Sequence, residues 1–279
     1  MNMVMGVIGY PIKHSLSPEM HRSAYKNLHI DYAYHAFEVS PANLKNAIDG
    51  VRGLGLKGLN VTIPHKVEVM AHLDEIDDLA VEIGAVNTIV NVDGKLKGYN
   101  TDGEGYLKSL KEYVNKDIRN LNTLIIGAGG AARAVALTLT KDGVNNLVIT
   151  NRTLSKAEDL AERCAKFSEA TVQTIKDIET NLQDFDIIIN TTSIGMSPNI
   201  DEMPIKLDNL KEGTFVSDLI YTPFKTKLLI EAENKGGKVL NGLDMFVYQG
   251  ALAFEKWTGL QAPTDIMRST VLNHLKGVK

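Results

Sequence analysis

The N-terminal part of the chain carries a set of small polar side chains near the ends of short apolar runs, together with one lysine and one carboxylate. They are Ser15, Ser17, Asn60, Thr62, Lys66, Asn87 and Asp102. Asn60 and Thr62 alternate along one expected strand, so their side chains share a face of the sheet. Hydroxyl and amide groups beside a single lysine and a single carboxylate suit a neutral polyol that bears a carboxylate. The pattern therefore indicates a binding site for a small molecule.

Each of these residues also has an ordinary structural explanation when it is taken alone. Ser17 precedes a proline and is a natural helix N-cap, Asp102 can cap the helix that follows it, and an isolated lysine is usually a surface residue. We expect Lys66 in the first turn of a helix that Pro64 opens and that runs to about Leu73. A cation is unfavourable at that end of a helix, so a lysine there indicates a role beyond helix stability.

A glycine-rich segment follows a short apolar run near the middle of the chain. Residues 123–126 predict a buried strand that leads directly into Gly127-Ala128-Gly129-Gly130-Ala131-Ala132, and a helix is expected from there to Lys141. In a dinucleotide-binding turn, the glycines permit the tight turn and a close approach of backbone to pyrophosphate. The phosphate then binds free amides at the positive end of the helix. An ordinary turn that uses glycine only for geometry is the alternative, and the strand–turn–helix context favours the cofactor.

The end of the next expected strand, residues 147–150, distinguishes between two nicotinamide cofactors. An NAD site usually carries Asp or Glu there, which binds the ribose 2′-hydroxyl. This chain has Asn151-Arg152-Thr153 instead, with Lys156 about one helical turn further on. A guanidinium can bind a 2′-phosphate bidentately, whereas an acid would repel it. Solvated surface charges are the ordinary alternative for Arg152 and Lys156, and without an acid at this position we expect NADP(H) rather than NAD.

Strand-like and helix-like stretches alternate along the whole chain, which predicts an α/β fold. The apolar runs at 123–126, 147–150, 186–190, 214–218 and 238–240 are typical of a parallel sheet covered by helices on both faces. A length of 279 residues suits about two domains. We expect an N-terminal α/β substrate-binding and catalytic domain at 1–102, completed by C-terminal helices at about 242–279. A doubly wound, Rossmann-like NADP-binding domain is expected at 103–241.

The composition excludes several classes of protein. Hydrophobic residues make up 44% and charged residues 23% of the chain, which excludes intrinsic disorder. A net charge of −4 with scattered basic residues indicates neither a nucleic-acid surface nor an anionic-membrane surface. The single cysteine, Cys164, excludes a disulfide framework, and the histidines lack metal-ligand spacing, so no metal is expected. Without a signal peptide or an apolar run long enough to span a membrane, we expect a cytoplasmic protein.

Several motifs, in order along the chain, closely resemble those of the shikimate dehydrogenase family. They are Gly9-Tyr10-Pro11, Ser15-Leu16-Ser17-Pro18, Asn60-Val-Thr-Ile-Pro-His-Lys66, Gly84-Ala-Val-Asn87-Thr88, Gly98-Tyr-Asn-Thr-Asp102, Gly127 to Ala132, Asn151-Arg152-Thr153 and Asn190-Thr-Thr-Ser-Ile-Gly-Met196. The resemblance covers essentially the whole chain. It implies an NADP-dependent oxidoreductase of aromatic amino-acid biosynthesis that interconverts 3-dehydroshikimate and shikimate.

The resemblance also implies a role for each matching residue. Ser15 and Ser17 would bind the substrate carboxylate, and Lys66 and Asp102 would contact substrate as the catalytic pair. The remaining substrate-binding residues would be Asn60, Thr62, Asn87, Tyr221 and Gln249. The cofactor would be held by Gly127, Ala128, Gly129, Gly130, Ala131, Asn151, Arg152, Thr153, Lys156, Thr192, Met196 and Gly242.

The implied reaction needs few groups. An alkoxide that develops on the ring requires a proton and a nearby positive charge, and a lysine ammonium provides both. A neighbouring carboxylate stabilises the ammonium form, so we expect Asp102 to orient Lys66 and the reacting hydroxyl. The sequence leaves open which of the two carries the proton.

Three other interpretations remain open at this point. A quinate/shikimate dehydrogenase that prefers NAD is disfavoured by Arg152 and the missing acid. An enzyme of the methylene-tetrahydrofolate dehydrogenase type would leave the paired serines and the Gly98–Asp102 motif unexplained. A non-catalytic metabolite-binding regulator would need neither Lys66 nor Asp102. We expect small-molecule partners only, and a monomer or homodimer.

Overall fold

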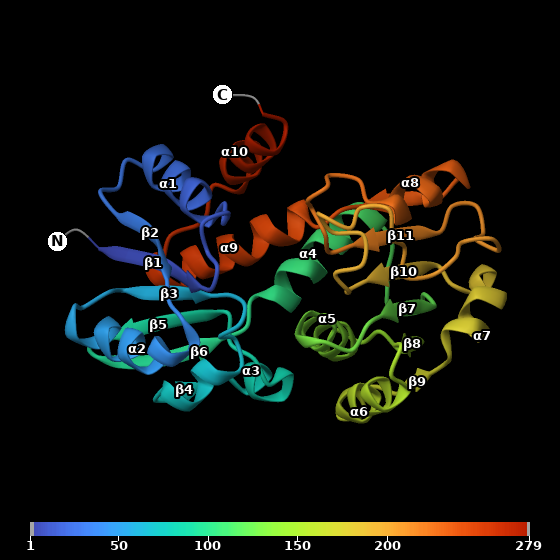
Figure 1. The fold of residues 1–279 in the computed structure, drawn as a ribbon, viewed down its shortest axis with the longest axis horizontal. Coiled ribbons are helices and arrows are strands. Elements are labelled where there is room, and N and C mark those ends of the chain that lie inside the picture. Colours follow the sequence, from blue (N-terminus) through green and yellow to red (C-terminus); the bar gives the residue numbers. More distant parts are fainter. Residues whose placement is uncertain (1–2, 278–279) are drawn as a thin grey trace. The chain divides into compact units, whose positions relative to one another are not determined.

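The computed structural model describes residues 3–277 and divides the chain into two compact units. The first unit comprises Met1–Gly105 and Val247–Lys279, and the second comprises Tyr106–Phe246. Each unit is built on its own six-stranded sheet with helices packed against it (Figure 1). This architecture confirms the predicted α/β class. Between residues 3 and 277, no helix is both long and apolar enough to cross a membrane.

The first unit has a mixed sheet whose strands are ordered β2-β1-β3-β5-β6-β4. The strands are β1 (Val4–Gly9), β2 (Ala33–Glu38), β3 (Gly58–Val61), β4 (Glu75–Ile76), β5 (Thr88–Val92) and β6 (Lys95–Tyr99). The helices are α1 (Ser17–Asn27), α2 (Leu44–Gly53), α3 (Asp78–Ile83), α9 (Leu243–Thr258) and α10 (Thr264–Leu275), with 3₁₀ turns at Pro41–Asn43 and Glu68–His72. β5 runs antiparallel to both of its neighbours, β3 and β6.

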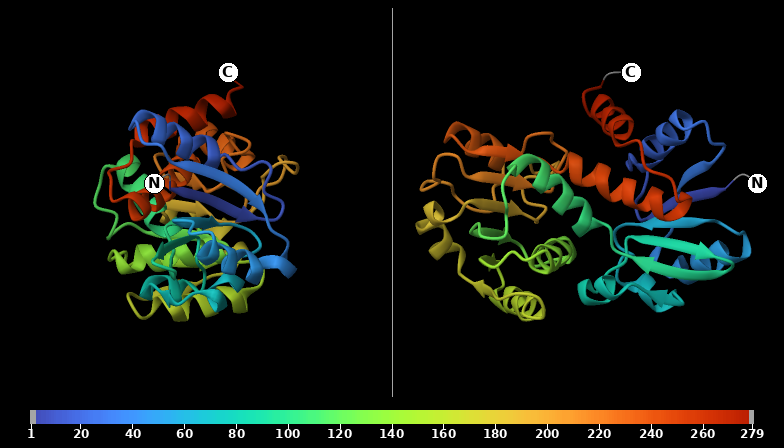
Figure 2. Two further views of the ribbon diagram at one scale, coloured as in Figure 1. Left: turned by 90° about the vertical axis from the view of Figure 1, so that its left-hand side faces the viewer. Right: turned by 180° about the vertical axis from the view of Figure 1, so that it is seen from behind.

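Helices cover both faces of this first sheet. α1, α9 and α10 lie on one face and α2 lies on the other (Figure 1), and α10 runs beside α1 (Figure 2). Trp257 of α9 donates a hydrogen bond from its ring nitrogen to the carbonyl of Ile89 in β5, at 2.8 Å. This bond and the surrounding apolar contacts attach the C-terminal helices to the N-terminal sheet.

The segment that carries Lys66 differs from the sequence prediction. The expected helix from Pro64 to about Leu73 is absent: residues 63–67 form turns, and only a short 3₁₀ helix follows at Glu68–His72. The carbonyl of Lys66 accepts a hydrogen bond from the Val86 amide at 2.8 Å and is therefore not available to a helix. The His65 ring also donates to the carbonyl of Val39, at 2.7 Å. Lys66 therefore lies in an anchored turn, and the argument from the helix dipole does not apply to it.

The second unit has a wholly parallel sheet ordered β12-β11-β10-β7-β8-β9, the order of a doubly wound fold. Its strands are β7 (Thr123–Ile126), β8 (Leu147–Thr150), β9 (Ala170–Val172), β10 (Ile187–Asn190), β11 (Phe215–Asp218) and β12 (Lys238–Leu240). Its helices are α5 (Gly130–Lys141), α6 (Leu154–Cys164), α7 (Ile175–Thr180) and α8 (Lys227–Asn234), with a 3₁₀ turn at Leu182–Asp184. α4 (Asp102–Val114) enters from the first unit.

Helices flank the second sheet on both sides. α5 and α6 lie along one face, and α7 and α8 lie along the other (Figure 1). The inner strands are largely apolar and buried, with Leu124, Ile149, Ile188 and Val216 fully shielded from solvent, whereas the edge strands β9 and β12 are partly exposed. This burial on both faces explains the near-continuous apolar runs in the sequence.

Candidate active site

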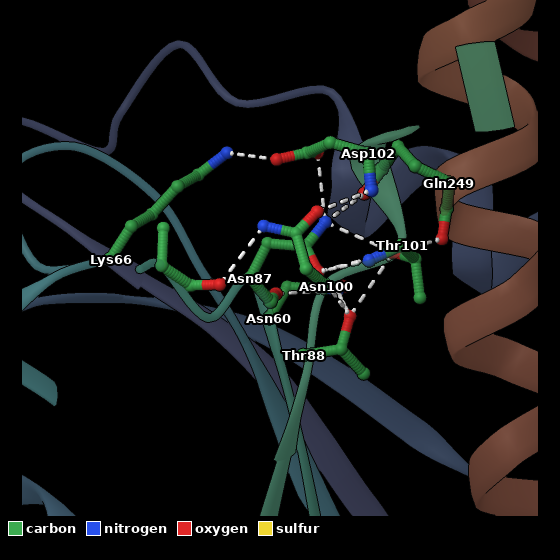
Figure 3. Close-up of polar contacts among 9 residues, drawn as sticks. Asn60, Lys66, Asn87, Thr88, Asn100, Thr101, Asp102 and Gln249 are labelled. Carbon is green, nitrogen blue, oxygen red and sulfur yellow. Dashed lines mark hydrogen bonds and ion pairs between the residues drawn. The ribbon is translucent and has the colours of Figure 1, made fainter. Parts of the chain in front are cut away.

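Lys66 and Asp102 form an ion pair in the first unit. The Lys66 Nζ atom lies 2.7 Å from the Asp102 Oδ2 atom (Figure 3). Lys66 extends from the turn after β3, whereas Asp102 is the first residue of α4 and follows β6 after Asn100 and Thr101. The Lys66 side chain is 30% exposed and that of Asp102 is 12% exposed. The ammonium is therefore accessible to a ligand, while its carboxylate partner is largely held within the protein.

Asn87 fixes the orientation of the Asp102 carboxylate. Its Nδ2 group donates to Asp102 Oδ1 at 2.8 Å and to Thr101 Oγ1 at 2.9 Å. Its Oδ1 atom accepts the Thr101 backbone N–H at 2.8 Å and the Thr88 hydroxyl at 3.0 Å. These partners determine which side-chain atom of Asn87 is the nitrogen and which is the oxygen, so the group that faces Asp102 is the Nδ2 donor. These contacts converge from the ends of β5 and β6 (Figure 3).

A second buried amide, Asn60 of β3, continues this network. Its Nδ2 group donates to Thr88 Oγ1 at 3.2 Å, and its Oδ1 atom accepts the Tyr34 hydroxyl at 2.7 Å. Tyr34 is completely buried in β2. Burial raises the pKa of the Tyr34 phenol well above its ordinary value, and the adjacent Ser17 side chain opposes part of that rise. Asn60, Ser17 and Tyr34 therefore lie together on the side of the sheet that faces α1.

The two predicted serines lie at the start of α1, where they contact each other. The Ser17 backbone N–H donates to the Ser15 hydroxyl at 3.4 Å, so Ser15 is held in a turn and remains partly exposed. Thr62 follows directly after β3 and is also partly exposed. The structure thus places hydroxyl groups at the ends of neighbouring elements of one sheet.

Gln249 reaches the network from α9 because α4 and α9 approach each other closely. An added Cβ on Gly105 would lie 2.6 Å from the Gln249 backbone nitrogen, so only glycine permits this contact. The Gln249 carbonyl accepts the Thr101 hydroxyl at 3.0 Å, and its side-chain oxygen lies 3.5 Å from Asn87 Nδ2. In the first unit, hydrogen bonds therefore connect Asn60, Asn87 and Gln249 to the Lys66–Asp102 pair.

In the second unit, the glycine-rich turn has the geometry that a dinucleotide needs. Gly127 has φ +116°, and an added Cβ there would lie 2.5 Å from the Thr191 hydroxyl oxygen. Above Gly129, by contrast, no atom lies within 4 Å of an added Cβ. Gly129 and Gly130 are exposed at the start of α5, so their backbone is open to a phosphate at the helix N-terminus. Ala128 and Ala131 flank this glycine pair and are partly exposed.

The segment after β8 carries exposed positive charge. Arg152, Thr153 and Lys156 are exposed and Asn151 is partly exposed. The Asn151 side chain donates to the Thr153 carbonyl at 2.8 Å, which shapes the turn before α6. In the described part of the chain, neither Arg152 nor Lys156 forms an ion pair. Two unopposed cations at the carboxyl edge of the sheet fit a phosphate on the ribose of a bound dinucleotide.

The remaining predicted residues lie beyond β10, β11 and β12. Thr192 donates from its backbone N–H and its hydroxyl to Asn190 Oδ1, at 3.0 and 2.7 Å. Met196 is 45% exposed, and Gly242 is buried where an added Cβ would collide with the Leu219 carbonyl. The Tyr221 ring packs on that of Phe246 with centroids 5.1 Å apart, and burial raises the pKa of its phenol. Tyr221 belongs to the second unit and not to the unit of the other predicted substrate residues.

Sequence reasoning missed several polar residues that the structure places in these networks. Thr88, Thr101 and Tyr34 support Asn60 and Asn87, and Asp218 lies buried at the end of β11. Asp218 ends an apolar strand at the ligand-binding edge of a parallel sheet, and this position could have marked it as a candidate functional residue from the sequence. Tyr34 gives no such signal, because a tyrosine in a strand is ordinarily a packing residue.

Arg133 of α5 was also not predicted from the sequence. Its Nε atom is buried without a hydrogen-bond partner among the described residues. One terminal nitrogen lies 3.9 Å from the position of an added Cβ on Gly130. A cation near the positive end of a helix is unfavourable without an anion. This arrangement agrees with a turn that accepts a phosphate group.

Comparison with known protein families gives three matches along the chain. The shikimate dehydrogenase substrate-binding domain matches residues 7–89, the shikimate/quinate 5-dehydrogenase domain matches residues 109–214, and the shikimate 5′-dehydrogenase C-terminal domain matches residues 242–272. A curated NADP(+)-type shikimate dehydrogenase from Geobacillus sp. (strain WCH70) is 51% identical over 99% of this chain and 100% of its own length.

Solved structures are similar over almost the whole chain. A shikimate dehydrogenase in complex with NADP+ superposes with a TM-score of 0.91 at 47% identity, covering 98% of this chain and 96% of that one. The Thermus thermophilus enzyme in complex with NADP(H) and shikimate has a TM-score of 0.89 at 34% identity, covering 97% and 99%. A quinate dehydrogenase from Corynebacterium glutamicum in complex with NAD reaches 0.90 at 30% identity, covering 98% and 99%.

Proposed function

The chain belongs to the shikimate dehydrogenase family, and we propose that it reversibly reduces 3-dehydroshikimate to shikimate with NADP(H) in aromatic amino-acid biosynthesis. The observation that carries the proposal is the Lys66–Asp102 ion pair, with Nζ and Oδ2 2.7 Å apart and Asn87 bound to the other carboxylate oxygen. A lysine that is accessible on one side and held by a buried network on the other is suited to acid–base chemistry on a bound ligand.

In this proposal, Lys66 donates a proton to the developing alkoxide in the reducing direction. Its positive charge stabilises that oxygen before the proton moves. Asn87 donates to Asp102 Oδ1 and so fixes the orientation of the carboxylate. Asp102 then holds the Lys66 ammonium through Oδ2 and orients the substrate hydroxyl. In the oxidising direction the same pair takes the proton back. The cofactor, when bound, would supply the hydride for reduction and accept it during oxidation.

The polar residues around this pair would bind and orient the substrate. Ser15 and Ser17 would bind its carboxylate, Asn60, Thr62, Asn87 and Gln249 would bind its ring hydroxyls, and Tyr221 would also approach the substrate. The glycine-rich turn (Gly127–Ala131) would bind the pyrophosphate, and Asn151, Arg152, Thr153 and Lys156 would bind the 2′-phosphate. Thr192, Met196 and Gly242 would contact the nicotinamide half. We further propose that the protein is cytoplasmic and that it is a monomer or homodimer. Light scattering after gel filtration tests the oligomeric state.

The initial rate of NADP+ reduction with shikimate, followed by absorbance of the reduced nicotinamide, tests the proposal. Quinate and NAD+ serve as parallel controls. Fast turnover that is selective for shikimate and NADP+ is expected. Turnover that favours NAD+ or quinate would instead support the second candidate, a quinate-type dehydrogenase, against which Arg152 and the missing acid argue. Folded protein that binds NADP+ but turns over none of these pairs would contradict both.

A further inference from the structure

A buried carboxylate lies at the end of β11 in the second unit, outside the set of residues to which we have assigned a role. Asp218 is 0% exposed. Its Oδ1 atom accepts the Asn190 side-chain amide at 3.2 Å and the Ile220 backbone N–H at 3.0 Å, and its Oδ2 atom accepts the Thr226 hydroxyl at 2.7 Å. No basic side chain in the described part of the chain forms an ion pair with it. Three neutral donors therefore hold a charge that is costly to bury.

Each of these donors belongs to a different segment near the cofactor residues. The other end of Asn190 accepts both hydrogen bonds from Thr192, so Asp218 fixes Thr192 through one intervening amide. Ile220 precedes Tyr221, and its carbonyl accepts the Gly242 N–H at 3.1 Å. A single carboxylate thus connects the segments that carry Thr192, Tyr221 and Gly242.

The third donor, Thr226, connects the same carboxylate to a helix and a neighbouring loop. Thr226 is the N-cap of α8, and its hydroxyl also accepts the Leu229 N–H at 3.4 Å. Gly195 lies against it, because an added Cβ on Gly195 would be 3.6 Å from the Thr226 Cβ atom. Gly195 has φ +93°, so the loop that leads to Met196 turns sharply at this contact. The loop after β10 therefore rests on the Asp218–Thr226 pair.

The position of Asp218 in the sheet identifies which half of a dinucleotide it serves. In a doubly wound sheet, a dinucleotide lies across the carboxyl ends of the strands on both sides of the topological switch point. Here the glycine-rich turn follows β7, and the cationic Arg152 segment follows β8 on one side. Asn190 and Asp218 end β10 and β11 on the other side, where they are register partners. The nicotinamide half therefore falls to the β10 and β11 side.

We propose that Asp218 is a positioning residue for the nicotinamide half of the cofactor. It acts through Asn190, Ile220 and Thr226, which hold the loops after β10 and β11 in the arrangement that accepts that half. The inference rests on the proposed function, since it assumes a bound nicotinamide dinucleotide. It adds a residue that touches neither cofactor nor substrate and yet controls the affinity for one half of the cofactor.

Calorimetric titration of two ligands against the full chain tests this role. NADP+ carries both halves of the cofactor, whereas adenosine 2′,5′-bisphosphate represents only the adenosine half. Asp218→Ala leaves three buried donors without an acceptor, so it should weaken NADP+ binding by at least about tenfold. Binding of adenosine 2′,5′-bisphosphate should stay within about twofold, because its contacts lie on the β8 side.

Two further variants distinguish positioning from general damage. Asp218→Asn should restore most of the NADP+ affinity, since its amide oxygen still accepts from Asn190 and Ile220 and its amide nitrogen can donate to Thr226. Thr214→Val is the matched control: Thr214 is buried just before the other end of β11 and donates to the Phe185 carbonyl at 3.2 Å. It should change the affinity for neither ligand.

Three results would overturn the inference: unchanged NADP+ affinity in Asp218→Ala, equal weakening of both ligands, or an Asp218→Asn variant as weak as Asp218→Ala. The wild-type titrations separate this question from the proposed function. If wild-type protein binds neither ligand, the proposed function fails before any variant is compared.

Discussion

Replacing Lys66 by alanine tests whether this residue carries the proton, because the expected loss of turnover and the expected loss of folding stability can both be given from the structure. Lys66→Ala leaves the Asp102 carboxylate, only 12% exposed, without its cation but with its hydrogen bond from Asn87, so folding stability should fall by about 1–3 kcal/mol. Removal of a proton donor, in contrast, typically lowers turnover by about 10²- to 10⁴-fold. This corresponds to at least about 2.7 kcal/mol in the activation free energy. Lys66→Ala should therefore lower kcat by at least about 10²-fold in a protein that still folds, and it should change the KM for shikimate far less.

Steady-state rates of NADP+ reduction and chemical denaturation measure both quantities on the same preparation. Lys111→Ala is the matched control, because Lys111 also lies 2.7 Å from a carboxylate, that of Asp142, and has no proposed role in the reaction. The control should keep wild-type kcat and KM. If Lys66→Ala retained turnover within a few-fold of wild type, or if Lys111→Ala lost as much, Lys66 would not be the proton carrier.

Three further variants probe the rest of the site. Arg152→Gln should raise the KM for NADP+ at least about tenfold and leave that for NAD+ nearly unchanged; equal changes in the two initial-rate series would contradict 2′-phosphate binding. Tyr34→Phe removes the donor to the buried Asn60 oxygen at 2.7 Å, which should cost about 1–3 kcal/mol in thermal denaturation and raise the shikimate KM more than it lowers kcat; an unchanged melting temperature would contradict it. Burial raises the pKa of Asp218 from 3.8 to about 6, so this group favours the folded state most below pH 3.8, and that contribution is lost as pH rises through about 6. The free energy of unfolding of Asp218→Asn, measured by urea denaturation, should therefore rise relative to that of wild type as pH increases from about 4 to about 7, by up to about 3 kcal/mol. A difference between the two proteins that does not depend on pH would refute this.

The sequence predicted local elements well where one interaction dominates. The strands at Thr123–Ile126, Leu147–Thr150 and Lys238–Leu240 have the predicted bounds, because short apolar runs between helices are buried on both faces. An Asp-Gly pair between two strand-like runs favours a tight hairpin, and Asp93-Gly94 joins β5 to β6 with positive φ at both residues. The helix predicted from Pro64 was wrong, because the backbone around Lys66 bonds to a distant segment instead of to its own next turn.

The networks around the candidate site depend on strand register, which the sequence does not specify. Asn60 and Thr88 are register partners in β3 and β5, and Asn190 and Asp218 are partners in β10 and β11. Alternation along one strand predicts which face a side chain occupies, but not which residue of another strand lies opposite it. Both pairs join residues 28 positions apart, so their hydrogen bonds exist only after the sheet has assembled. Residue types at strand ends could therefore mark Asn60 and Lys66 as candidates. The hydrogen bond between Asn190 and the buried Asp218 carboxylate, which has no basic partner among the described residues, could be found only from the three-dimensional structure. Through Asn190, this bond holds the loop that carries Thr192.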